Sequence, residues 1–459
     1  QGPTPNFRRM PFPPSRLTWA ETRRKAAHMA AFWPALFLPW MSPLQALGVT
    51  FALLLMNVFV LPWAARGLYR AEESGMGALE IVLYPAALMA CVIAFGRPGK
   101  PAWYLPAGAA WFALAFVDAC LGLACRLLPG GPALPWNPRK PAAAVLLGTA
   151  LSLLPAFALA HWALPPLSPG GWAAVALLVL VAACAETAWF GVADNLAIPF
   201  FLSVLIPLFP NPLLAGGRLP SPDWLWAVPV AFGALAYAGR LLTLGGAVLG
   251  AIMAFLLIFA DPRLFLFLGG FFALGNLATR FGSARKRALG IAEARGGRRG
   301  AAEVFGAMGV AAWMTPLARD GNAAGLLVCI APLIAKTMDT VSSEMGKAVG
   351  GRTVSLRTFR AVAPGTEGGV SLAGTLCGLA AAGAMAAAAM PLGWGGPADA
   401  LALAAIAVLA NVFESLWGEW AVRRGMDQGP HTNVLMTLAA AVPAWLLWVA
   451  YSGGERLFR

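Results

Sequence analysis

Long, uninterrupted apolar runs dominate the chain. Residues 30–65 carry no charged side chain, and a serine and a proline divide this run at Met41–Pro43. The other candidate spans are 78–96, 104–127, 141–163, 172–191, 196–214, 223–242, 244–260, 264–279, 303–318, 323–340, 368–391, 398–420 and 433–452. A helix needs ~20 apolar residues to cross the hydrocarbon core, and lipid cannot satisfy exposed backbone groups. The pattern therefore predicts an all-α polytopic transmembrane bundle of roughly 15 spans.

Composition and charge place this bundle in a membrane. Hydrophobic residues make up 59% of the chain, charged residues make up 12%, and the mean hydropathy is +0.71. The formal net charge is +13, concentrated in the segments 8–25, 280–299, 352–360 and 423–424. Basic loops stay on the cytoplasmic side, so these loops should face the cytoplasm from a bacterial cytoplasmic (inner) membrane. No soluble segment is long enough for a nucleic-acid-binding module, so no nucleic-acid partner is expected.

The chain also resembles itself. Polar residues that are costly in lipid recur in the same order in both halves. The matching pairs are Asp118 with Asp339, Gly148 with Gly374, Glu186 with Glu414, and Asn195 with Asn433. These pairs predict an internal duplication, with domains 1–215 and 216–459 joined by the Pro- and Gly-rich connector 209–224. The alternative is chance similarity between helices rich in Ala, Gly and Leu.

Acids and hydroxyls gather in the stretch "DTVSSEMG". On a helix, Asp339, Ser342 and Ser343 share one face, whereas Glu344 lies about 140° from Asp339. Either the helix breaks near Ser342, or the two acids serve different partners. Ionisable residues at membrane depth are candidates for function, and both acids are candidate Mg²⁺ ligands with the serines near a nucleotide. The alternative for the acids is an ion pair with Lys336 or Lys347.

The stretch "APGTEGGVS" offers flexible backbone N–H groups before a new apolar run, a place that suits phosphate oxygens. Arginines nearby could screen the negative charge of phosphates. The predicted nucleotide- and phosphate-binding residues of this half are Ser342, Ser343, Pro364, Gly365, Thr366, Gly368, Gly369, Ser371, Arg298, Arg299, Arg357 and Arg360. The alternative for the glycines is close packing between membrane helices.

The second half resembles the domain-of-unknown-function family ninety-two of integral membrane proteins. The resemblance rests on "LTLGGAVLGAIMAF", "DTVSSEMG", "PGTEGGVSLAGT", "ESLWG" and "HTNVLMT". That family includes plant and cyanobacterial phytyl-phosphate kinases. The resemblance implies a prenyl-phosphate kinase in which Asp339 and Glu344 hold Mg²⁺ and CTP is the expected donor. It also adds Glu414, Ser415 and Asn433 as polar site residues.

The first half resembles the polyprenol, dolichol and phytol kinase family, which is similar to CTP-using phosphatidate cytidylyltransferases. The matching segments include "ETRRKAAHMAAF", "FVDACLGLACRLL", "PWNPRKPAAAVLLGT" and "ETAWFGVADNLAIPF". Residues 141–144, Pro-Ala-Ala-Ala, replace polar residues that the family carries after Asn-Pro-Arg-Lys. The resemblance implies a site made of Asp118, Asn137, Arg139, Lys140, Glu186, Asp194 and Asn195. Asp118 or Glu186 would act as the base if the site phosphorylates an alcohol.

Together these features predict a membrane-embedded prenyl-lipid kinase. The second half would phosphorylate a prenyl monophosphate such as phytyl phosphate. The first half would either make that monophosphate from the alcohol or, as a decayed copy, shape the lipid cavity. Two other functions fit the same pattern, namely a CTP-dependent lipid cytidylyltransferase and a non-catalytic lipid transporter.

Overall fold

The computed structural model describes residues 19–60, 77–96, 103–134, 137–187, 194–205, 225, 227–318, 322–423 and 430–451. The α-helices of the first half are α1 (Trp19–Ala30), α2 (Pro43–Leu55), α4 (Gly77–Phe95), α5 (Tyr104–Phe112), α6 (Asp118–Leu127), α7 (Ala142–Ala163), α8 (Pro169–Thr187) and α9 (Asp194–Leu205). Those of the second half are α10 (Ala227–Ala238), α11 (Leu244–Ala260), α12 (Leu264–Arg280), α13 (Ser283–Ala288), α14 (Ala301–Trp313), α15 (Thr315–Ala318), α16 (Ala323–Val349), α17 (Leu372–Ala387), α18 (Pro397–Arg423) and α19 (Pro430–Tyr451).

The predicted apolar runs form helices, and the all-α membrane bundle is confirmed. Within the described ranges, 8 helices are long and apolar enough to cross a membrane, and shorter apolar helices lie between them. The chain is thus an integral, multi-pass membrane protein. The number of spans stays a prediction, because a short apolar helix can also be a buried core helix or a segment at the membrane interface.

The predicted division of the first apolar run at Met41–Pro43 is confirmed. A 3₁₀ segment, η1 (Trp33–Trp40), ends just before it, and α2 begins at Pro43. Ser42 is the N-cap of α2 and forms a capping box with Gln45. Serine and proline favour a helix start because the hydroxyl satisfies an orphan N–H and proline at the first position loses no hydrogen bond.

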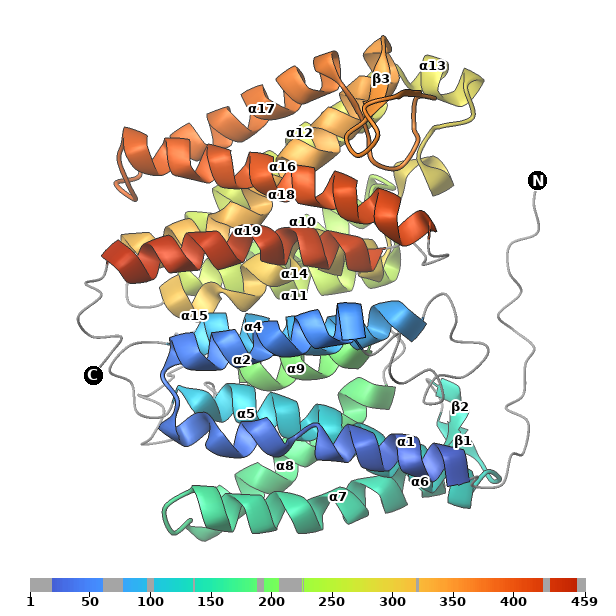
Figure 1. Ribbon diagram of the computed structural model, residues 1–459, viewed down its shortest axis with the longest axis vertical. Coiled ribbons are helices and arrows are strands. Elements are labelled where there is room, and N and C mark those ends of the chain that lie inside the picture. Colours follow the sequence, from blue (N-terminus) through green and yellow to red (C-terminus); the bar gives the residue numbers. More distant parts are fainter. Residues whose placement is uncertain are drawn as a thin grey trace.

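In the part of the chain that the structure describes, two small sheets lie between the helices, and the apolar pattern does not predict them. In the first half β1 (Ala133–Leu134) pairs with β2 (Asn137–Pro141), antiparallel. In the second half β3 (Thr353–Ser355) lies between β4 (Ala361–Val362) and β5 (Gly369–Ser371), also antiparallel. Both sheets lie at the same end of the helices (Figure 1). Each follows a helix that carries an aspartate and precedes another long helix.

The two halves are stacked on one another, with α4 and α9 of the first half facing α14, α15 and α19 of the second (Figure 1). Phe200 of α9 makes edge-to-face contacts with Phe305 and Trp313 of α14, with ring centroids 5.3 and 5.5 Å apart. The Trp313 indole N–H donates to Ser203 Oγ at 2.8 Å. The proposed boundary at residue 215 lies outside the described residues, so the domain division and the duplication stay predictions.

Candidate functional site

A polar pocket of about 450 Å³ lies at the end of the second half that carries the β3–β5 sheet. Its walls come from α16, α18, the start of α19, the loop between β4 and β5, and the segment before α14. The predicted residues that line it are Asp339, Ser342, Ser343, Glu344, Pro364, Gly365, Thr366, Gly368, Gly369, Ser371, Glu414, Ser415, Asn433, Arg298 and Arg299. Tertiary structure thus brings together residues as distant in the chain as Arg298, before α14, and Asn433 of α19.

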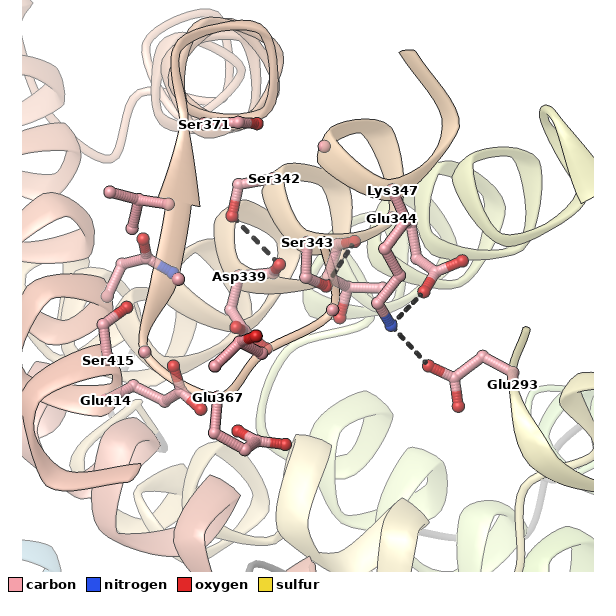
Figure 2. A pocket seen from close by; sticks show the side chains of 18 of the residues that line it. Glu293, Asp339, Ser342, Ser343, Glu344, Lys347, Glu367, Ser371, Glu414 and Ser415 are labelled. Carbon is pink, nitrogen blue, oxygen red and sulfur yellow. Dashed lines mark hydrogen bonds and ion pairs between the residues drawn. The ribbon is translucent and has the colours of Figure 1, made fainter. Parts of the chain in front are cut away.

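Asp339 lies in a chain of polar contacts. Lys336 Nζ donates to Asp339 Oδ2 at 2.5 Å and to Asn433 Oδ1 of α19 at 2.6 Å. The ion pair between Asp339 and Lys336 was one of the alternatives that the sequence left open, and it is present. Figure 2 shows Glu367 and Glu414 beside Asp339, so the lysine is the cation of a carboxylate-rich corner.

The ion-pair partners of Glu344 differ from those of Asp339. Helix α16 continues unbroken to Val349, which turns Glu344 away from Asp339 and toward α13. Its Oε2 accepts from Lys286 Nζ at 2.6 Å, in a pair whose two side chains are each only 2% exposed. Its Oε1 accepts from Lys347 Nζ at 3.0 Å. Both carboxylate oxygens are therefore neutralised by lysines.

The donor set is compatible with Mg²⁺ on one side of the pocket. No group of three or more His, Cys, Asp or Glu side chains is arranged to hold a metal ion within the described ranges. Mg²⁺ commonly needs only one or two carboxylates, because waters and substrate phosphates complete its octahedron. Asp339 with Glu367 or Glu414 fits that requirement better than Asp339 with Glu344. The metal roles of Asp339 and Glu344 stay predictions.

The two serines are held by their own helix. Ser342 Oγ donates to the Asp339 carbonyl at 3.1 Å, and Ser343 Oγ donates to the Thr340 carbonyl at 3.3 Å. Each hydroxyl oxygen keeps acceptor capacity for a ligand donor or a metal. Ser371 has a structural task, since its hydroxyl accepts from the Gly374 N–H at 3.2 Å and caps the N-terminus of α17.

The glycine turn between β4 and β5 needs its glycines. Gly365 and Gly368 have positive φ values of 83° and 73°, a region that side chains rarely adopt. A Cβ on Gly368 would lie 2.6 Å from the Ser415 carbonyl oxygen of α18. The turn is therefore pressed against α18, next to Glu414. Such a turn can present backbone N–H groups to an anion.

Glu367 sits in this turn, and the sequence interpretation passed over it as a spacer. It lines the pocket, and desolvation together with the negative charge of Asp339 raises its pKa. Lys336, Lys347 and Glu293 also line the pocket without having been assigned a binding role. The signal available for Glu367 was its position inside a turn whose other residues were all predicted to bind phosphate.

The predicted arginines divide into two groups. Arg298 and Arg299 line the pocket, and Arg299 is held by backbone bonds of 3.0 Å to Leu241 and Thr243. Arg357 and Arg360 are exposed and are not among the lining residues. Both arginines lie in the connection between β3 and β4. The phosphate-binding role of all four arginines stays a prediction.

The predicted residues of the first half form a smaller polar cluster. Lys25 Nζ donates to Asp118 Oδ2 at 2.9 Å, and His28 Nδ1 lies 3.8 Å from the same oxygen. Lys140 Nζ donates to Glu186 Oε1 at 2.6 Å. Burial lowers the pKa of Lys140, but the Glu186 carboxylate outweighs it, and the net effect is a raised pKa. Each acid therefore has its own lysine.

The rest of this cluster is only partly described. Asn137 Nδ2 donates to the Thr187 carbonyl at 3.0 Å, which ties β2 to the end of α8. Asp194 and Asn195 open α9. The side chain of Arg139 lies outside the described part of the chain. The roles assigned to these residues stay predictions.

Comparison with known proteins identifies a family that the second half of the chain resembles. The model of the family described as Integral membrane protein DUF92 matches residues 227–443. "Protein VTE6, chloroplastic" of Arabidopsis thaliana is 36% identical over 209 residues, which cover 43% of this chain and 63% of that protein. An uncharacterized membrane protein of Synechocystis sp. is 39% identical over 128 residues, or 25% of this chain and 46% of that protein.

A third relative, an uncharacterized membrane protein of Methanocaldococcus jannaschii, is 28% identical over 204 residues, or 44% of this chain and 84% of that protein. The chain spans less than two thirds of the length of the first two relatives, 63% and 46% respectively. No solved structure matches the chain. The resemblance of the first half to polyprenol kinases stays a prediction. The second half of the chain, which holds the larger polar pocket, is thus similar to the integral membrane protein family DUF92.

Proposed function

We propose that the second half transfers a phosphoryl group from a nucleoside triphosphate to a prenyl monophosphate such as phytyl phosphate. The observation that carries this proposal is the polar pocket of about 450 Å³ at one end of an apolar bundle. Its carboxylates on α16 and α18 face a glycine turn and several cations. A pocket of this kind can hold phosphates next to a lipid phase.

Phosphoryl transfer depends on positioning and charge neutralisation more than on covalent catalysis. An oxygen of the acceptor phosphate attacks the γ-phosphorus, the bond from that phosphorus to the bridging oxygen breaks, and the nucleoside diphosphate leaves with the electron pair. The acceptor is already an anion, so no general base is required. Backbone N–H groups of the glycine turn would bind phosphate oxygens, and Lys336, Arg298 and Arg299 would offset the negative charge.

Bound Mg²⁺ would supply charge neutralisation for the phosphates. Asp339 would be its main protein ligand, because it lines the pocket and Glu367 and Glu414 lie beside it. Glu344 is better suited to holding α13 against α16. This assignment differs from the sequence prediction, in which Glu344 was the second ligand.

The substrate class and the donor come from the resemblance. The family that the second half resembles includes phytyl-phosphate kinases, and the family model matches residues 227–443 of this same half. CTP is the proposed donor. The pocket lies at the end of the bundle that carries the basic segments 280–299 and 352–360. Because basic loops stay on the cytoplasmic side, we place this end of the bundle at the cytoplasmic face of a bacterial cytoplasmic membrane.

The test is purified protein in lipid nanodiscs, incubated with Mg²⁺, γ-labelled CTP or ATP, and either phytol or phytyl phosphate, followed by product chromatography. We expect labelled phytyl diphosphate and unlabelled CDP from phytyl phosphate. Asp339→Asn should lower turnover by about two orders of magnitude or more, as loss of a metal-binding charge in the transition state does. Asp399→Asn is the matched control, because Asp399 caps α18 through the Gly396 N–H at 2.8 Å, away from the pocket.

Other products would identify the two other functions. Release of inorganic pyrophosphate with a CDP-lipid would show a cytidylyltransferase. Lipid movement between leaflets without nucleotide turnover would show a transporter. If Asp339→Asn lowers thermal stability and leaves activity per folded molecule intact, Asp339 is only a structural partner of Lys336.

A further inference from the structure

The polar pocket of the second half extends into the part of the bundle that spans the membrane. Its lining includes Thr375, near the start of α17, and Asn411 of α18. Asn411 lies near the middle of α18, a helix that is long and apolar enough to cross a membrane. Glu414 and Ser415 line the pocket one turn nearer the end that carries the β3–β5 sheet. The pocket therefore reaches from that end to membrane depth.

The side chains of Thr375 and Asn411 make no hydrogen bond with the residues that the structure describes. Other threonines of spanning helices bond to their own helix, as Thr337 Oγ1 does by donating to the Leu333 carbonyl at 2.7 Å. An amide or hydroxyl without a partner is costly at membrane depth. Thr375 is exposed and Asn411 is half-buried, so both side chains are available to a polar ligand.

Helices α17 and α18 rest on different elements at this end of the bundle. They meet at the connection 388–396 and diverge toward the sheet (Figure 1). Gly374 and Gly378 pack α17 against α16, where an added Cβ would lie 2.3 and 2.8 Å from backbone oxygens. Helix α18 packs against the glycine turn, because a Cβ on Gly368 would lie 2.6 Å from the Ser415 carbonyl oxygen. The pocket therefore has a side opening between the two helices.

The outer surface around this opening is apolar. Exposed apolar residues follow one face of each helix, at a spacing of three or four residues. They are Leu372, Leu376 and Leu379 of α17 and Leu409, Val412 and Leu416 of α18. Thr375 lies within the α17 face, between Leu372 and Leu379. Exposed apolar side chains of a spanning helix face the hydrocarbon of the bilayer, so the opening connects the polar pocket to lipid.

We infer that the acceptor lipid enters the pocket sideways from the bilayer, between α17 and α18, while the nucleotide enters from the end that carries the sheet. The acceptor phosphate accepts hydrogen bonds from the Thr375 hydroxyl and the Asn411 amide. Its hydrocarbon chain stays in the bilayer along the apolar faces of the two helices. A route through water would instead expose every CH₂ group of the chain, which is costly. This inference rests on the proposed function and adds two acceptor-binding residues to it.

Photochemical capture tests the route. The full chain in nanodiscs carries the photoreactive residue p-benzoylphenylalanine at Leu376 or Val412 and is illuminated with radiolabelled phytyl phosphate. The control positions are Leu235 of α10 and Leu266 of α12, which are exposed leucines outside the pocket lining. We expect about fivefold more captured label at Leu376 and Val412 than at the controls, and competition by unlabelled phytyl phosphate.

Kinetics test the two side chains. Thr375→Val and Asn411→Leu each remove hydrogen-bond donors at nearly constant size. Because each loses a hydrogen bond to a charged group, the KM for phytyl phosphate should rise about tenfold. The KM for the nucleotide and kcat should stay within about twofold, since the lost contact is made equally in the ground and transition states. Thr358→Val is the matched control, because Thr358 is exposed on the β3–β4 connection and does not line the pocket.

The outcomes separate this inference from the proposed function. Equal capture at all four positions, in a protein that phosphorylates phytyl phosphate, would overturn the lateral route and support the function. Unchanged KM for phytyl phosphate in both variants would overturn the roles of Thr375 and Asn411. A rise in both KM values together with a lower melting temperature would also overturn them, since it indicates a structural role. Selective capture in a protein without kinase activity would contradict the proposed function and support the lateral lipid-phosphate site.

Discussion

At the scale of single residues, the buried ion pair between Lys286 and Glu344 holds the basic helix α13 against α16. Lys286 also donates to the carbonyls of Ala278 and Thr279 at 2.9 and 3.1 Å, so it joins the end of α12, α13 and α16. Glu344→Gln should destabilise the protein by about 3–5 kcal/mol, because it leaves a buried ammonium without its counter-charge. The measurement is unfolding in detergent by denaturant.

A double variant and a control variant test whether the lost ion pair causes the loss of stability. The double variant Lys286→Met with Glu344→Leu should recover much of the lost stability, since a buried pair can be replaced by apolar residues. The side chain of Glu293, which pairs with Lys347, is 47% exposed. Glu293→Gln should therefore change the free energy of unfolding by less than about 1 kcal/mol. If Glu344→Gln is as stable as the wild type but loses its Mg²⁺-dependent turnover, Glu344 is a metal ligand after all.

Glu367 makes stability depend on pH. Its pKa is raised above the ordinary value of 4.5 by desolvation and by Asp339, so in the window above pH 4.5 the folded state holds more protons than the unfolded state. Stability attributable to this residue therefore falls as pH rises through that window. Glu367→Gln should make the fall in melting temperature less steep, measured without divalent cations. A variant that follows the wild-type pH dependence would contradict the burial of this carboxyl beside Asp339.

At the scale of elements, glycines let α17 cross α16 at the site. A Cβ on Gly374 would lie 2.3 Å from the Ser342 carbonyl oxygen, and one on Gly378 would lie 2.8 Å from that of Met338. Close packing therefore explains Gly374 and Gly378 of α17, whereas Gly365 and Gly368 have the positive φ values of the turn. Small residues allow such approaches between membrane helices.

Gly374→Ala should accordingly destabilise the protein by about 1–3 kcal/mol and lower turnover, because backbone cannot yield and α17 must shift from Ser342. Gly383→Ala on the same helix is the control, since nothing lies within 4 Å of its added Cβ. That control should be neutral or stabilise the helix by about 0.5–1 kcal/mol. Equal effects of the two substitutions, measured by thermal unfolding, would show that the crossing is not tight.

At the scale of the whole molecule, the basic segments share one end. Helix α13, the β3–β4 hairpin and the end of α18 lie at the end that also carries β1 and β2 (Figure 1). We expect cysteines introduced at Arg285, Arg357 and Arg423 to react with an impermeant maleimide only from the cytoplasmic side. Pro391→Cys, in the connection between α17 and α18 at the opposite end, should react only from outside. Labelling of any one of the three from outside would contradict a shared cytoplasmic site.

The sequence alone determined the class of fold and indicated many of the residues that line the polar pocket. Apolar runs must become helices in lipid because no other local structure satisfies the backbone there, so the spans and the break at Ser42 could be predicted. The glycines and acids of the stretch 338–375 also stood out, because polar residues are rare in so apolar a chain.

Only tertiary structure decided which of these residues meet. Asp339 and Glu344 are neighbours in sequence, yet the unbroken α16 turns them toward Lys336 and Lys286, which lie on different sides of the helix. Arg357 and Arg360 are close in sequence to the glycine turn, yet the β3–β4 reversal leaves them exposed. Periodicity reports which face a residue occupies but not what packs against that face, and ion-pair partners 58 residues apart are chosen by helix packing.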